Sequence, residues 1–173
     1  ISIAPGCKTP ANAWDLENFI EIGHRLPAAE NCELVIIGGE NERAAGEKMC
    51  AAWGAGINSA GSLSVRESAA LLSICDFHIG LDTGTTHLAA VVETRCFAIY
   101  GERNNPGHWY PAGEEHLIIC HPVKCAGCRA EVCPIPSHPC MNEITVESVW
   151  NNLQNFMKDS PSDLKKSIQI ITV

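Results

Sequence analysis

The chain has 173 residues, of which 46% are hydrophobic, and this is enough for one ordinary domain with a single core. Its formal net charge of -8 argues against nucleic acid as a partner, because binding to a phosphate backbone needs a basic surface. No stretch has the length of a membrane span, and no secretory signal pattern is present.

Short β-rich runs alternate along the chain with longer runs whose apolar residues recur at helical spacing. In chain order we expect a strand at Ser2–Ala4, a helix at Trp14–Leu26, a strand at Glu33–Ile37, a helix at Asn41–Trp53, a strand near Ile57, a helix at Val65–Ile74, a strand at Phe77–Leu81, a helix at Thr83–Val92, strands at Cys96–Tyr100 and Leu117–Ile119, and a helix at Val146–Met157. This alternation, with strands that are apolar on both faces, predicts an α/β fold with a doubly wound parallel sheet.

We assign residues 1–157 to one domain with a cysteine-rich loop at 120–140, and residues 158–173 to a tail or linker. The tail is polar and contains Pro161, although its last residues, "SIQIITV", have the composition of a strand without an obvious partner. The chain begins with Ile1 rather than Met and runs directly into a strand, so we expect it to be the second half of a longer protein.

In an open α/β sheet, ligands bind beyond the carboxyl ends of the strands. The segments that follow the predicted strands are "PGCK", "GGENE", "DTGTTH" and "YGERNNPGHWYP". In the third of these, Asp82 ends a buried strand, Thr83 and Gly84 make a tight turn, and a helix begins at once. Free amides at such a helix start bind anions, and His87 lies one turn further on the same side. These residues predict a phosphate site, and the alternative is that Asp82 or Thr83 only caps the helix.

Two other strand ends carry charged side chains. Glu40 follows Gly38 and Gly39, where doubly wound nucleotide sites place an acid that binds ribose hydroxyls, and its alternative role is to favour the following helix dipole. Lys8 follows a Pro-Gly turn and either neutralises a diphosphate or is an ordinary exposed lysine. Neither G-x-G-x-x-G after the first strand nor a P-loop is present, and G-x-S-x-G is also missing, so dehydrogenases, P-loop enzymes and serine hydrolases are not indicated.

The ten cysteines fall into two groups. Five are scattered through apolar segments and are expected to be buried thiols. The others lie close together, and Cys125, Cys128, Cys133 and Cys140 have a spacing that suits either reduced thiols, disulfides or a structural zinc site, with an iron-sulfur cluster less favoured.

The motifs and their order resemble those of glycosyltransferase family 9, which contains the ADP-heptose:lipopolysaccharide heptosyltransferases. The resemblance lies in "PG…W…F" from Pro5 to Phe19, "VIIGGENE", "LSVRESAALLSICDFHIGLDTGTTHLAA", "FAIYG" followed by "HWYP", and "CAGCRAEVCPIPSHPCMNEITVESVW". It extends to about Phe156 and covers only the C-terminal, Rossmann-like half of a GT-B enzyme. It implies a donor domain that binds a nucleoside diphosphate sugar, with ADP-heptose as the expected donor, for an inverting transfer that needs no cofactor.

The resemblance also assigns roles to residues. Asp82, Thr83, Gly84 and His87 match the element that holds the donor diphosphate, and Glu40 matches the acid on the ribose. The family's phosphate-binding lysine usually precedes a Trp-Pro pair, whereas here Asn12 and Ala13 precede Trp14 and Asp15 follows it, which leaves Lys8 as the substitute.

The general base and the surface for a lipid-linked glycan acceptor are expected in an N-terminal half, so this chain alone should be inactive. The whole enzyme should be cytoplasmic and peripheral at the inner membrane. The rival interpretations are a scaffold module with a metal-binding cysteine loop and a GT-B-like UDP-sugar epimerase.

Overall fold

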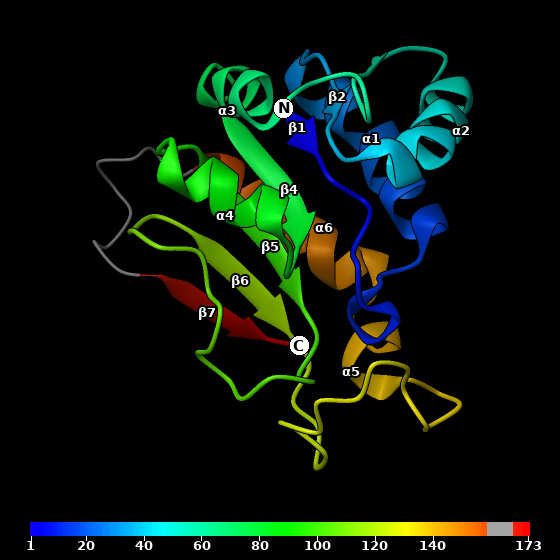
Figure 1. Ribbon diagram of the computed structural model, residues 1–173, viewed down its shortest axis with the longest axis vertical. Helices are drawn as coiled ribbons and strands as arrows, with labels where there is room; N and C mark the ends of the chain where they lie inside the picture. Colours follow the sequence, from blue (N-terminus) through cyan, green and yellow to red (C-terminus); the bar gives the residue numbers. More distant parts are fainter. Residues whose placement is uncertain (159–167) are drawn as a thin grey trace.

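The computed structural model describes residues 1–158 and 168–173, apart from the side chains of residues 28–30 (Figure 1). The elements in chain order are β1 (Ser2–Ile3), η1 (Pro10–Asn12), α1 (Leu16–Glu30), β2 (Val35–Ile36), η2 (Glu40–Glu42), α2 (Arg43–Trp53), β3 (Ile57–Asn58), α3 (Val65–Ser73), β4 (Phe77–Leu81), α4 (Gly84–Val91), β5 (Arg95–Tyr100), β6 (Leu117–Cys120), α5 (Pro139–Asn142), α6 (Val146–Lys158) and β7 (Gln169–Thr172).

The seven strands form one sheet in the order β3-β2-β1-β4-β5-β6-β7, and every pair is parallel. The predicted α/β class with a parallel sheet is therefore confirmed. Chain order reverses between β1 and β4, which makes the gap between their carboxyl ends the topological switch point.

The tail prediction needs one correction. Residues 169–172 form β7, which pairs with β6 and places Ile170 opposite Ile118, so the sheet continues past the predicted boundary at residue 157. The polar stretch predicted as a linker lies almost entirely outside the described residues. The composition of the last seven residues indicated a strand, but its partner depends on the tertiary fold.

Helices cover both faces of the sheet. The larger apolar cluster joins α1, α2 and α6 to one face, and Phe156 of α6 packs edge-on against Phe77 of β4 and Phe97 of β5 at 5.7 Å between ring centroids. A second cluster joins α3 and α4 to the opposite face through Leu72 and Ala89. Figure 1 shows α4 crossing in front of the sheet, with α6 behind it.

Local signals explain where the helices begin. The capping box predicted at Ser64 and Glu67 is present, because each side chain accepts a hydrogen bond from the other residue's backbone amide. Helix α1 begins two residues later than predicted, because the carboxylate of Asp15 caps it by accepting from the Glu17 amide. Helix α2 also begins later than predicted, after the short helix η2. Among the described residues, no helix is long and apolar enough to cross a membrane.

Candidate functional site

The candidate site lies at the carboxyl edge of the sheet, around the switch point between β1 and β4. Strand β4 ends at Leu81 and delivers Asp82, while the β1 loop reaches the same edge through Cys7 and Lys8. The Ala4 amide donates to the Ile79 carbonyl at 2.9 Å, so the β1 chain stays paired with β4 up to the point where the two loops diverge.

Asp82 is held by two amides that the sequence motif did not include. The Nδ2 atoms of Asn12 and Asn104 donate to its Oδ2 at 3.2 and 3.0 Å. Burial raises the pKa of Asp82, and the Asn104 hydrogen bond, the charge of His87, the Asn12 hydrogen bond and the charge of Arg103 oppose this increase. The side-chain hydrogen bonds of Asp82 run to these asparagines, and the N-cap residue of α4 is Thr83, so Asp82 does not cap the helix.

The start of α4 is open. Thr83 is its N-cap residue, but its hydroxyl makes no capping bond, and the buried Oγ1 atom has no hydrogen-bond partner within the described residues. Gly84 is exposed, and a Cβ added there would meet nothing within 4 Å. His87 is half-buried one turn later, and its charge acts on Asp82. The structure therefore brings Asp82, Thr83, Gly84 and His87 together around free helix amides, an arrangement that suits an anion.

Buried polar contacts fix α4 from behind. The hydroxyl of Thr86 donates to the Leu81 carbonyl at 2.7 Å and lies 3.4 Å from Nε2 of His78, while the other ring nitrogen of His78 lies 3.0 Å from the Ser2 hydroxyl. Burial lowers the pKa of His78 to about 3, so its ring stays neutral at physiological pH. Sequence analysis missed this group because a histidine inside a strand carries no distinctive spacing.

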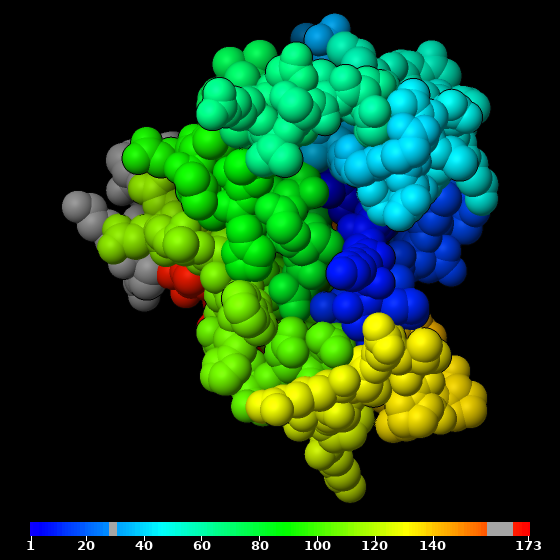
Figure 2. All heavy atoms as spheres, viewed as in Figure 1, coloured from blue at the N-terminus to red at the C-terminus, as the bar shows by residue number. Residues whose placement is uncertain are grey.

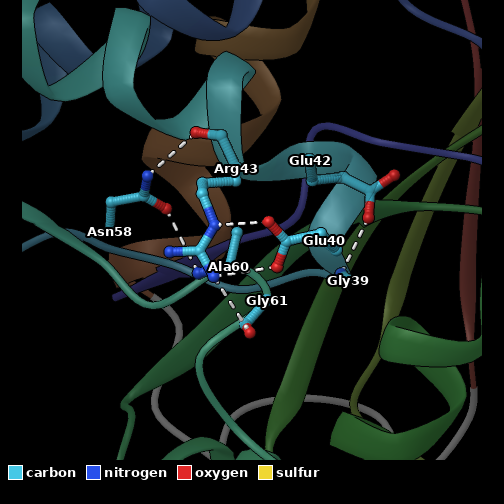
Figure 3. Close-up of polar contacts among 7 residues, drawn as sticks. All are labelled: Gly39, Glu40, Glu42, Arg43, Asn58, Ala60 and Gly61. Atoms are coloured by element: carbon cyan, nitrogen blue, oxygen red, sulfur yellow. Dashed lines mark hydrogen bonds and ion pairs between the residues drawn. The ribbon is translucent and has the colours of Figure 1, made fainter.

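Glu40, the predicted ribose acid, is already engaged by an arginine (Figure 3). Its two carboxylate oxygens accept from Nε and Nη2 of Arg43 at 2.8 Å each, and Nη2 also donates to the Gly61 carbonyl at 3.1 Å. This pairing lowers the pKa of Glu40. Gly61 has a φ of +69°, and a Cβ there would lie 2.4 Å from the Glu40 carboxylate, so glycine is the residue that this packing accepts.

Glu42, which we did not predict, lies closer to the switch point. Its Oε2 atom accepts from the Gly39 amide at 2.7 Å, and a Cβ added at Gly6 would lie 2.2 Å from its Cγ. The thiol of Cys7 has a raised pKa because of burial, and the negative charges of Asp82 and Glu42 add to the effect. Glu42 and Asp82 therefore flank the β1 loop from its two sides, whereas Glu40 points toward Arg43.

Lys8 is exposed, and its side chain forms no hydrogen bond or ion pair with any part of the chain that the structure describes. Asn12 is buried, and its Oδ1 atom likewise has no partner among the described residues. The position before Trp14 thus holds a neutral amide bonded to Asp82 rather than a cation, and Lys8 is the nearest lysine in the sequence that follows β1.

The four predicted metal cysteines lie in one place. Cys125, Cys128, Cys133 and Cys140 line a small cavity, together with the wall residues Ala11, Glu102, Arg103, Val123, Ala130, His138 and Pro139. All four are free thiols. Among residues 1–158 and 168–173, no three His, Cys, Asp or Glu side chains are already close enough to hold a metal ion.

The fold and the edge together define a Rossmann-like α/β domain whose ligand-type side chains gather at the switch point. The family model described as glycosyltransferase family 9 (heptosyltransferase) matches residues 1–138. The chain therefore belongs to glycosyltransferase family 9, as the motifs indicated.

Similar proteins agree with this assignment. Lipooligosaccharide heptosyltransferase 2 of Campylobacter jejuni serotype O:2 is 30% identical over 90 residues, which cover 51% of this chain and 28% of that protein. The structure of E. coli ADP-heptose lipopolysaccharide heptosyltransferase II superposes with a TM-score of 0.74 at 21% identity, covering 90% of this chain and 45% of the other. TibC, an iron-containing heptosyltransferase of enterotoxigenic E. coli solved with ADP-D-beta-D-heptose, gives 0.64 at 19% identity over 92% and 46% of the two chains. The chain thus spans less than half the length of each of these proteins.

Proposed function

We propose that this chain is the donor-binding half of an inverting glycosyltransferase and that the nucleoside diphosphate sugar it binds is ADP-heptose. The observation that carries the proposal is the open start of α4 at the switch point, with Asp82 anchored beside it. The names of two structural neighbours include ADP-heptose, which supports the choice of donor.

Different residues of the site bind different parts of the donor. The free amides at Gly84 and Thr85 take the diphosphate oxygens, and His87 and Lys8 add cationic donors. An ionised carboxylate repels phosphate but accepts from hydroxyl groups, so Asp82 faces the sugar and holds its side of the turn in place. An acid after β2 binds the ribose hydroxyls. Glu40 was the predicted residue, but Glu42 lies closer to the β1 loop.

The chemical step itself needs groups outside this chain. A base removes the proton of the acceptor hydroxyl, its oxygen attacks the anomeric carbon, and the bond to the diphosphate breaks on the opposite face. The leaving diphosphate carries the developing charge, which the α4 amides stabilise in the bound geometry. We place the base and the lipid-linked glycan acceptor in an N-terminal half, so this chain alone binds donor without transferring the sugar.

The proposed product and cellular location follow from that transfer reaction. Such a transfer builds lipopolysaccharide or a similar surface glycan, and the enzyme works in the cytoplasm, peripheral to the inner membrane. The transfer step is proposed to need no cofactor, because helix amides and side-chain cations balance the leaving-group charge.

Calorimetric titration with ADP, UDP and GDP tests the proposal. We expect ADP to bind most tightly and His87→Ala to weaken it about tenfold or more, as expected when a charged hydrogen bond is lost. His24→Ala is the matched control, because His24 is exposed on α1, and it should leave the affinity unchanged. Equal affinity for all three nucleotides, or equal losses in the two variants, would contradict the donor assignment, and no binding by the folded chain would favour the scaffold interpretation.

A further inference from the structure

The cysteine loop, residues 120–140, has its polar backbone well anchored along one side. Arg103 donates from Nε to the Ala130 carbonyl at 2.8 Å and from Nη2 to the Arg129 carbonyl at 3.1 Å. The Ala11 amide donates to the Glu131 carbonyl at 3.1 Å. Figure 2 shows the loop, in yellow, packed against the N-terminal segment in blue and the segment after β5 in green.

The loop lacks an apolar core of its own. Val132 is 68% exposed and Ile135 is 38% exposed, and of the loop's large aliphatic side chains only Val123, near its start, packs against the main core. Cys125, Cys128 and Cys133 line the cavity together with the buried Cys140 of α5; Cys125 and Cys133 are partly buried, and Cys128 is exposed to solvent. A loop of this length with little regular structure and little apolar packing needs another source of order.

The Cys-x-x-Cys segment already has the turn that a metal knuckle requires. The Cys128 amide donates to the Cys125 carbonyl at 3.1 Å, which closes a turn, and both cysteines line the same cavity. Gly127 has a φ of +77° inside that turn, and its amide donates to the Glu102 carbonyl at 2.8 Å. Arg129 follows with a φ of +55°, a conformation that non-glycine residues adopt only when their surroundings hold them.

We propose that Cys125, Cys128, Cys133 and Cys140 bind one thiolate-preferring divalent metal ion, zinc or ferrous iron, which fastens the middle of the cysteine loop to the start of α5. The four thiols give up their protons on binding, and four sulfur ligands satisfy the tetrahedral coordination that both ions accept. Rotation about χ1 moves a cysteine sulfur by a few ångströms, which lets the four sulfurs close on an ion from their places around the cavity.

The neighbouring groups suit this site. Arg103 lies in the cavity wall and offsets part of the negative charge that four thiolates and one divalent ion leave. Glu102 shares the wall and is buried, and its carboxylate lies close enough to the Cys120 thiol to help burial raise the pKa of that thiol. Nε2 of His138 lies 3.1 Å from the Ala11 carbonyl, so this ring nitrogen is engaged, whereas all four cysteines are free thiols.

Metal analysis of the purified chain tests the proposal directly. The protein is reduced, reconstituted separately with Zn²⁺ and Fe²⁺ without oxygen, desalted and measured by mass spectrometry of the metal. We expect one ion per chain, with the two reconstitutions showing which metal is kept, and its loss in Cys125→Ser and Cys128→Ser. Cys75→Ser is the matched control, because its thiol lies at the end of α3 and donates to the Leu71 carbonyl.

Trypsin supplies a second measurement that does not depend on any variant. Lys124 and Arg129 are exposed within the loop, and the bound ion should slow cleavage after them about tenfold, with a chelator restoring it. Failure to retain either metal, disulfides among the four cysteines in freshly reduced protein, or equal metal loss in Cys75→Ser would overturn the proposal. Neither measurement involves a nucleotide, so its outcome is separate from that of the donor-binding proposal.

Discussion

Replacing Asn104 with alanine should destabilise the protein in a way that depends on pH. Asn104 supplies one of the two amides on the Asp82 carboxylate, and Asn12 alone remains after the substitution. A hydrogen bond to a charged group contributes about 1.5 to 3 kcal/mol, and because Asn104 and Asp82 are both half-exposed we expect about 1 kcal/mol here.

The sign of the pH dependence follows from the direction of the Asp82 shift. Burial already raises the pKa of Asp82, and removing a donor to its carboxylate raises it further. Only the ionised form of Asp82 loses the stabilisation that the Asn104 hydrogen bond gives. The destabilisation is therefore largest at neutral pH and shrinks as the pH falls through the folded-state pKa of Asp82.

Urea unfolding of the wild type and Asn104→Ala, at about pH 7 and at about pH 4, measures this difference. Asn105→Ala is the matched control, because Asn105 is the exposed neighbour whose side chain makes no hydrogen bond within the described residues, and it should change stability by less than about 0.5 kcal/mol. A loss of the same size at both pH values would refute the assignment of Asn104 to the Asp82 carboxylate.

Two further predictions concern the acids after β2 and the histidine behind α4. Glu42→Gln should weaken ADP binding in calorimetry more than Glu40→Gln does, because Arg43 already occupies the Glu40 carboxylate, and the reverse order would restore Glu40 as the ribose acid. His78 has a lowered pKa of about 3, so the unfolded chain binds a proton that the folded chain does not, and stability should fall by about 1.4 kcal/mol per pH unit as the pH drops from about 6.5 toward that value. His78→Gln should flatten this slope in urea unfolding, and an unchanged slope would show that other groups control the acid sensitivity.

The fold was largely predictable because the strands and helices differ in length and apolar pattern. Strand β4 is buried along its whole length, and its run from Phe77 to Leu81 is apolar enough to be found from sequence. Strand β7 shows the limit, because its residues have the composition of a strand but its pairing with β6 depends on how the chain returns to the sheet edge.

The site was predictable only where one continuous motif carries it. Asp82, Thr83, Gly84 and His87 follow one another, so the sequence places them together. Asn12 and Asn104 come from two other loops and meet Asp82 only after folding.

The sequence also could not decide whether Glu40 or Glu42 is placed to bind the ribose. Both acids follow the same Gly-Gly pair, and only the backbone direction of η2 sends Glu40 toward Arg43 and Glu42 over Gly6. Sequence spacing alone does not distinguish them, because a short 3-10 helix turns side chains two residues apart to different sides.

The balance of charge at the switch point has a consequence for donor binding. Asp82 and Glu42 bring two carboxylates to the β1 loop, while Asn12 brings a neutral amide that Asp82 holds. Arg103 is turned toward the carbonyls of the cysteine loop, so the attraction for a diphosphate rests on the start of α4, His87 and Lys8. A helix start and exposed cations are screened by salt. The affinity of the chain for ADP should therefore fall as ionic strength rises, and an affinity that is independent of salt would mean that buried contacts to the nucleoside, rather than these groups, hold the donor.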